Sequence, residues 1–284
     1  MTHPTVGSLR VNGATLHYEV RGRGPLLLLI PGGTGGAASF DGIADDLAAD
    51  HTVATYDPRG MSRSTLDDPE AEQRVAEHAE DALRILDLLS PGEPARVFGS
   101  SSGAIVALHL LTTHPERVER VVAHEPPVVE VLPDAAEHRA LLARVQATFH
   151  SQGLAPAMAV FAAGLTKDGK GAEPKAEIEI ELPPQAAARA EQTMADLPYF
   201  VGRIVPSFMS YVPDVRRLAT LSDRLVLAGG QDSRGELPYR PAAQLTERLG
   251  TDLLHFPGGH VGLTTHSAEF GALLRKAFDG APAR

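Results

Sequence analysis

The chain of 284 residues contains no cysteine, which excludes disulfides, thiolate metal sites and a cysteine nucleophile. Long hydrophobic runs are also missing. The longest apolar run, residues 26–31, is far too short to cross a bilayer. The first residues lack the basic and apolar regions of a signal peptide. We therefore expect a cytoplasmic protein that does not enter a membrane.

Positive charge is scarce as well. The net charge of −10 argues against nucleic acid and anionic membrane surfaces as partners. The composition, 43% hydrophobic and 22% charged, is typical of a globular chain with room for one large α/β domain and an insertion. Lysine is rare while arginine, alanine, glycine and proline are common, as in proteins from GC-rich bacterial genomes. We expect a monomer or homodimer that acts on a small molecule.

Short apolar segments alternate with amphipathic ones along most of the chain. Asn12-Gly13 lies between two alternating segments and predicts a β-hairpin. Further strands are expected at residues 26–30, 51–56, 95–98, 118–123, 224–228 and 253–256, and helices at 40–49, 75–89 and 104–113. This alternation predicts an α/β fold with a mostly parallel central sheet and helices on both faces.

Residues 128–218 interrupt the alternation. They contain helical segments at 135–149, 156–164 and 186–197, and a charged stretch rich in proline and glycine at 167–184, which predicts an exposed, mobile loop. We interpret residues 128–218 as an inserted helical cap, or lid, on a core formed by residues 1–127 and 219–284.

The pattern G-x-S-x-G at residues 99–103 lies between an expected strand and an expected helix. This context predicts a nucleophile elbow, in which Ser101 occupies a sharp, strained turn with its hydroxyl exposed. Glycine is needed at positions 99 and 103 because the two arms of the turn nearly touch. Ser101 is therefore the candidate nucleophile.

A serine nucleophile needs a base within hydrogen-bond reach and a carboxylate that orients the base. His260 follows the expected strand 253–256 in a glycine-containing loop, and active groups in parallel sheets gather past the carboxyl ends of strands. His255, inside the strand, and His266, in an expected helix, are less well placed. We predict His260 as the base.

Two carboxylates could orient His260, and only their distances from it can decide between them. Asp232, after the expected strand 224–228, is the leading candidate. Glu125, after the expected strand 118–123, is the alternative acid.

An oxyanion hole needs two N–H donors. The backbone of Ser102, at the start of a helix, would supply one. The glycine-rich loop at 31–36 would supply the other, with Gly33 preferred over Thr34. This loop does not match the spacing of nucleotide-binding loops and no Walker lysine follows it. We expect no cofactor and no metal.

Together these residues resemble the α/β-hydrolase superfamily, and the resemblance covers nearly the whole chain outside the cap. Residues 57–64 look like the D-x-R-G-x-G-x-S loop of that family, in which Asp57 and Arg59 are expected to brace the loop. Ser62 stands where the family usually has glycine. Pro31 stands where many relatives have histidine.

The resemblance implies the α/β-hydrolase fold and a bacterial serine hydrolase of the esterase, lactonase, thioesterase or C–C-bond hydrolase kind. Relatives with dehalogenase or epoxide hydrolase activity have aspartate at the elbow, so Ser101 argues against those activities. The aromatic and methionine residues of the cap indicate a small, largely apolar substrate. The alternatives are a cofactor-free non-hydrolytic enzyme, such as a perhydrolase or lyase, and a non-catalytic ligand-binding protein on the same fold.

Overall fold

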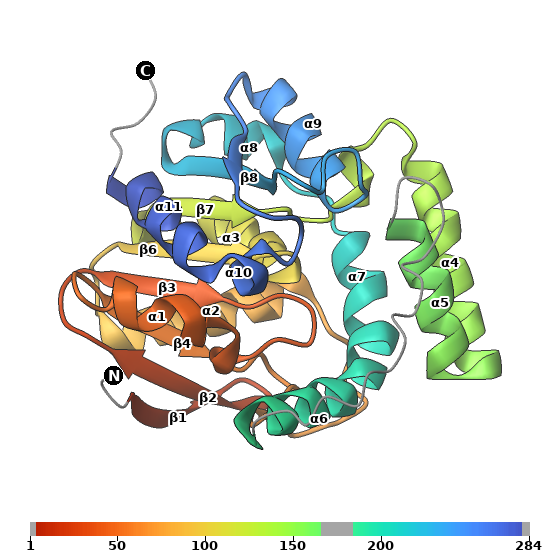
Figure 1. Ribbon diagram of the computed structural model, residues 1–284, viewed down its shortest axis with the longest axis horizontal. Helices are drawn as coiled ribbons and strands as arrows, with labels where there is room; N and C mark the ends of the chain where they lie inside the picture. The colour runs from red at the N-terminus through yellow and green to blue at the C-terminus, as the bar shows by residue number, and fades with distance from the viewer. Residues whose placement is uncertain (1–3, 166–183, 280–284) are drawn as a thin grey trace.

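The computed structural model describes residues 4–165 and 184–279, with a nine-stranded sheet at its centre (Figure 1). Along the sheet the strands follow the order β1-β2-β4-β3-β6-β7-β8-β9, with β5 paired to β2. β1 and β5 pair antiparallel with β2, as does β4, and all other pairs are parallel. The strands are β1 (Thr5–Val11), β2 (Ala14–Arg21), β3 (Leu26–Ile30), β4 (Thr52–Tyr56), β5 (Thr65–Leu66), β6 (Ala95–Ser100), β7 (Val118–His124), β8 (Leu225–Gly230) and β9 (Leu254–Phe256).

Helices cover both faces of this sheet, as the sequence predicts. The α-helices are α1 (Asp41–Leu47), α2 (Val75–Leu89), α3 (Ser102–Thr113), α4 (Ala135–Gln152), α5 (Leu154–Leu165), α6 (Pro184–Tyr199), α7 (Val205–Met209), α8 (Val215–Ala219), α9 (Tyr239–Leu249), α10 (Gly262–Thr265) and α11 (Ser267–Asp279). Among the described residues, no helix combines the length and the apolar character that crossing a membrane requires.

The side chains of β3 show how the two faces are built. All five residues of β3 are buried, and successive side chains of a strand point to opposite faces. Leu27 and Leu29 pack in one cluster with the apolar faces of α1 and α11. Leu28 and Ile30 pack in another cluster with those of α2 and α3. A continuous apolar run is therefore what a strand covered on both sides requires.

The chain between β7 and β8 carries the predicted helical insertion. Figure 1 shows α4, α5, α6 and α7 gathered beside one end of the sheet. A π-helical turn, η4 (Phe200–Ile204), joins α6 directly to α7. Helices α4, α5 and α7, together with η4, share a separate apolar cluster that includes Val145, Phe161 and Val205. The predicted loop at 167–184 lies outside the described residues, except that residue 184 begins α6.

Candidate active site

Ser101 forms a sharp turn between β6 and α3. Its backbone has φ 52° and ψ −121°, a conformation that residues other than glycine rarely adopt. A Cβ on Gly99 would lie 2.4 Å from the carbonyl oxygen of Gly103, and one on Gly103 would lie 2.4 Å from that of Ile30. The predicted reason, crowding against the other arm of the turn, is confirmed for Gly99. For Gly103 it is wrong, because the atoms that a Cβ would meet belong to the end of β3 and to the residue after it. The strand extends to Ser100 and the helix begins at Ser102, so the turn is tighter than the sequence pattern indicates.

His260 reaches Ser101 from the loop after β9. Its Nε2 atom lies 3.2 Å from Ser101 Oγ, across 159 positions of sequence. The two competing histidines have other partners. His255 Nε2 lies 2.9 Å from the hydroxyl of Tyr239, and His266 Nδ1 lies 2.9 Å from that of Thr265. His260 is therefore the histidine that the fold brings to the elbow.

Glu125 is the carboxylate that contacts His260. It follows β7 directly, with φ 49°, and its side chain is fully buried. Oε2 lies 2.6 Å from His260 Nδ1. Oε1 accepts hydrogen bonds from the backbone N–H of Gly230, at 2.8 Å, and from the hydroxyl of Ser233. Burial by itself raises the pKa of Glu125, but its hydrogen bonds, led by that to His260, hold the pKa below its usual range.

The structure does not bring Asp232, the leading acid candidate, to the imidazole. Strand β8 ends at Gly230, and the chain then turns so that Asp232 is exposed while Ser233 is buried. The N–H of Asp232 donates to the carbonyl of Gly258. Ser233 is a polar partner that sequence reasoning missed. No pattern around it distinguishes it from an ordinary turn serine.

The glycine-rich loop after β3 lies beside the elbow. A Cβ on Gly32 would lie 2.7 Å from Ser101 Cβ. Gly33 has φ 62°, and its N–H donates to the side-chain oxygen of Ser102 at 3.1 Å. Ser102 is the first residue of α3, where backbone N–H groups are free and the helix dipole favours negative charge. The two predicted oxyanion donors are therefore neighbours.

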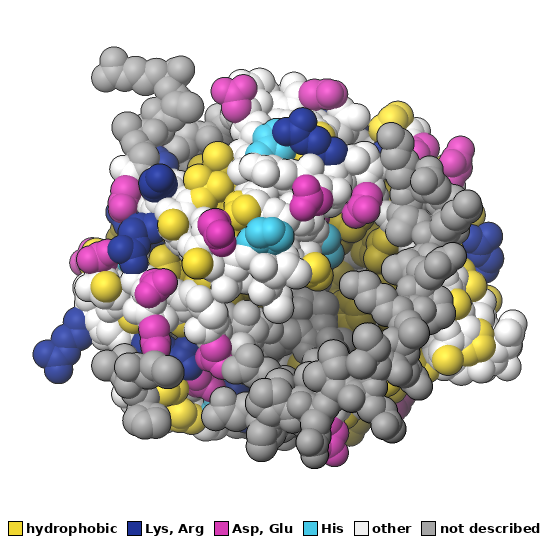
Figure 2. Space-filling model, in the orientation of Figure 1, with side chains coloured by type: hydrophobic (Ala, Val, Ile, Leu, Met, Phe, Trp, Pro, Cys, Tyr) yellow, Lys and Arg dark blue, Asp and Glu magenta, His cyan; other side chains and the backbone are white. Residues whose placement is uncertain are grey.

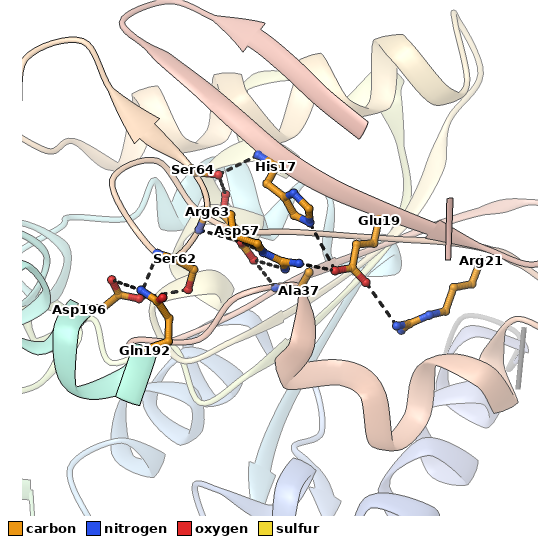
Figure 3. Close-up of polar contacts among 10 residues, drawn as sticks. All are labelled: His17, Glu19, Arg21, Ala37, Asp57, Ser62, Arg63, Ser64, Gln192 and Asp196. Carbon is orange, nitrogen blue, oxygen red and sulfur yellow. Dashed lines mark hydrogen bonds and ion pairs between the residues drawn. The ribbon is translucent and has the colours of Figure 1, made fainter. Parts of the chain in front are cut away.

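The loop at residues 57–64 contacts the chain directly after the glycine-rich loop, through Asp57 and Ala37 (Figure 3). Asp57 is fully buried and its Oδ1 accepts the N–H of Ala37 at 2.8 Å. Arg59 forms a two-point ion pair with buried Asp81, at 2.7 and 2.6 Å. The predicted bracing role of Asp57 and Arg59 agrees with these contacts.

A cavity of about 500 Å³ opens at Ser101 and His260. Figure 2 shows hydrophobic side chains in a hollow of this face, beside a histidine. Among the described residues the cavity wall carries no Asp, Glu, Lys or Arg. Its larger apolar side chains are Phe40, Ile105, Phe161, Leu165, Phe200, Ile204, Val205, Phe208, Met209, Val261 and Leu263. Of the nine aromatic and methionine residues that the sequence highlights in the insertion, four line the cavity: Phe161, Phe200, Phe208 and Met209. The described residues include no cluster of three or more His, Asp or Glu that could hold a metal.

Comparison with known proteins identifies the family to which this chain belongs. A family model described as alpha/beta hydrolase fold matches residues 25–153. An uncharacterized hydrolase, YraK, of Bacillus subtilis (strain 168) is 36% identical over 273 residues, which cover 94% of each chain. A zearalenone hydrolase of Bionectria ochroleuca is 37% identical over 122 residues, covering 41% of this chain and 45% of that protein. The solved structure of a thermophilic esterase from Thermogutta terrifontis superimposes with a TM-score of 0.73 at 15% identity, covering 99% of this chain and 100% of that one. The chain belongs to the alpha/beta hydrolase family.

Proposed function

We propose that this hydrolase cleaves a carboxylic ester, lactone or related acyl bond of a small, largely apolar substrate through a Ser101–His260–Glu125 triad. One observation carries the proposal: two successive contacts, of 3.2 and 2.6 Å, join the serine to the imidazole and the imidazole to a buried carboxylate. This arrangement can move a proton away from the hydroxyl as it attacks.

The reaction has two halves. In the first, Ser101 Oγ attacks the substrate carbonyl while His260 Nε2 takes the hydroxyl proton, and the imidazolium then gives this proton to the leaving oxygen. An acyl-enzyme remains. In the second, a water attacks the acyl carbon, again with His260 as base, and the carboxylic acid leaves as Ser101 regains its proton.

Glu125 has a positional and an electrostatic role in these steps. Accepting the proton of Nδ1 fixes the tautomer that leaves Nε2 free to act as a base. The negative charge, buried beside the ring, stabilises the imidazolium that forms in the transition state. The N–H of Gly230 and the hydroxyl of Ser233 both donate to Oε1, so they hold Oε2 toward the ring.

The N–H groups of Ser102 and Gly33 would bind the oxyanion of each tetrahedral intermediate. Without substrate, the N–H of Gly33 is satisfied by Ser102 Oγ. The substrate oxygen would take the place of that hydroxyl as it binds. The hydrogen bond to Ser102 Oγ therefore holds the N–H of Gly33 in place before substrate binds. Substrate would replace it with a stronger hydrogen bond from the same N–H to the charged oxygen of the intermediate.

The cavity indicates the chemical character of the acyl group. Its volume, about 500 Å³, lies within the range usual for small-molecule sites. Since its described wall carries many apolar side chains and no Asp, Glu, Lys or Arg, a neutral, hydrophobic group gains most from entering it.

We also propose that the helices between Ala135 and Met209 form the cap of this site. They supply the cavity residues Phe161, Phe200 and Phe208. The expected limits were residues 128 and 218. Residue 218 lies inside α8. Because α8 packs on the core helices α3 and α9, we assign it to the core and place the end of the cap at Met209, where α7 ends.

A panel of p-nitrophenyl esters of increasing acyl length, with lactones and thioesters, tests the function. We expect hydrolysis that favours longer or bulkier acyl groups and is lost in Ser101→Ala and His260→Ala. Binding of these compounds without turnover would favour a ligand-binding protein instead. Formation of a peracid would favour a perhydrolase, and cleavage of a bond without addition of water across it would favour a lyase.

A further inference from the structure

Ser62 combines a strained backbone with a specific contact. It has φ 51°, in the left-handed region that favours glycine, and the family motif that residues 57–64 resemble usually has glycine here. The Ser62 hydroxyl and its N–H both donate to Asp196 Oδ2, at 3.1 and 3.0 Å. Serine therefore accepts a conformation that suits glycine and gains a hydrogen bond that glycine cannot make.

Asp196 is the partner of Ser62 on α6 (Figure 3). Only 7% of this residue is exposed, and Gln192, one turn earlier on the same helix, donates to its Oδ1 at 3.1 Å. A buried carboxylate is costly unless hydrogen bonds satisfy it. Ser62 provides two of the three bonds that the described residues give it. The loop at residues 57–64 and helix α6 are therefore held together by the hydrogen bonds between Ser62 and Asp196, on which the buried carboxylate also depends.

The helix that Asp196 anchors continues into one wall of the substrate cavity. α6, η4 and α7 follow one another without a break. Together they place six residues on the cavity: Thr193, Phe200, Ile204, Val205, Phe208 and Met209. The hydroxyl of Tyr199 also donates to the carbonyl of Arg59, at 3.1 Å, so the same loop holds this wall at a second point.

The opposite side of the loop is attached to the catalytic machinery. Asp57 accepts the N–H of Ala37, directly after the glycine-rich loop that carries Gly33, and also the N–H of Arg63 at 3.1 Å. A Cβ on Gly36 would lie 2.4 Å from Asp57 Oδ1. Residues 57–64 therefore connect the oxyanion loop on one side with the cavity wall on the other.

We propose that Ser62 and Asp196 are positioning residues that hold the α6–α7 wall in register with Ser101 and thereby set which acyl groups the cavity accepts. The inference rests on the proposed function for its substrate. Without the Ser62–Asp196 contact, a long acyl group has to order this wall as it binds, which weakens its binding. A short acyl group that does not reach the wall is unaffected.

The decisive variant is Ser62→Gly, because glycine adopts the backbone of Ser62 without strain. It removes the CH₂OH side chain and its hydrogen bond to Asp196, and it keeps the backbone N–H that also donates to Asp196. We expect KM for an octanoyl ester to rise about tenfold, as for one lost hydrogen bond to a charged group. We expect kcat and the KM of an acetyl ester to stay within about twofold, and the melting temperature not to fall. Ser207→Ala is the matched control, since Ser207 Oγ donates to the carbonyl of Arg203 within the same helical wall.

Asp196→Ala, alone and combined with Ser62→Gly, tests whether Ser62 acts through Asp196. The proposal expects Ser62→Gly to change the octanoyl KM no further once Asp196 is gone. Additive effects of the two changes, or an unchanged ratio of octanoyl to acetyl KM in Ser62→Gly, would overturn it.

Hydrogen–deuterium exchange of residues 190–209 separates this proposal from the proposed function. Faster exchange in Ser62→Gly than in the wild type and Ser207→Ala supports the anchor even if the wild type cleaves no ester, in which case the proposed function alone fails. Unchanged exchange overturns the anchor whatever the activity.

Discussion

Replacing Glu125 by glutamine should reduce kcat far more than replacing Asp232 by asparagine. Both residues follow neighbouring parallel strands, and both changes remove one negative charge at nearly constant volume. Only Glu125 contacts His260, whereas Asp232 is exposed. The pair is therefore a matched test of which carboxylate serves the base.

The expected size of the effect follows from the geometry. Two unit charges about 4 Å apart interact by about 4 kcal/mol at an effective dielectric constant near 20, which corresponds to about a thousandfold in rate. Loss of tautomer control adds to this, and triads that lose their acid by an amide replacement slow by about ten-thousandfold. We expect Glu125→Gln to reduce kcat by about 10³–10⁴ and Asp232→Asn to change it by less than about threefold.

The assay is steady-state hydrolysis of a p-nitrophenyl ester, with thermal melting as the control for folding. The control is needed because all three groups around the Glu125 carboxylate can donate hydrogen bonds, and the glutamine NH₂ must face one of them. A folded Glu125→Gln protein with more than a tenth of wild-type kcat, or a larger loss in Asp232→Asn, would refute the assignment.

Three further predictions concern the nucleophile, the elbow and acid stability. Ser101→Ala should reduce kcat by about 10⁶, and residual ester turnover near the wild-type level would point to another nucleophile. Gly103→Ala should lower the free energy of unfolding in urea by about 3 kcal/mol, because the new Cβ would lie 2.4 Å from the carbonyl oxygen of Ile30. The control Gly92→Ala has φ 79° but open space around its Cβ, so it should lower the same free energy by about 1 kcal/mol. Equal losses in the two variants would contradict this reasoning. Burial lowers the pKa of His78 to about 3 and that of His124 to about 4, so these rings stay neutral in the folded chain while the unfolded chain takes up protons near pH 6.5. The two neutral rings contribute their full share to the free energy of unfolding above about pH 7. This contribution is lost as the pH falls toward the pKa values of the folded state, by about 2 kcal/mol for each ring at pH 5. Denaturation midpoints that do not differ between pH 7 and pH 5 would contradict this prediction.

The sheet and its covering helices were predictable because their pattern is local. The apolar run of β3 and the amphipathic spacing of α2 each reflect which faces are buried, and the structure has both elements at the predicted residues. The short strand β5 was not predicted. Its two residues, Thr65 and Leu66, pair with β2, and so short a segment has no periodicity to recognise.

The proximity of Ser101 and His260 was predictable because glycines and strand ends mark both residues in the sequence. Which of Glu125 and Asp232 contacts His260 was not predictable, since both follow strands whose carboxyl ends lie side by side. It is decided by the turn after Gly230, which exposes Asp232 and buries Ser233. The contact between Ser62 and Asp196 joins residues 134 positions apart. A serine in place of the usual glycine marks one end of it, and nothing in the local sequence marks the other.

The most direct test of the account is labelling with a fluorophosphonate, followed by intact-mass measurement and peptide mapping. A serine whose proton is taken by a neighbouring imidazole reacts with this probe. The account predicts one adduct per chain, on Ser101, with slow labelling in His260→Ala and Glu125→Gln and a normal rate in Asp232→Asn. A folded wild-type protein that stays unlabelled, or carries its adduct on another residue, would contradict it.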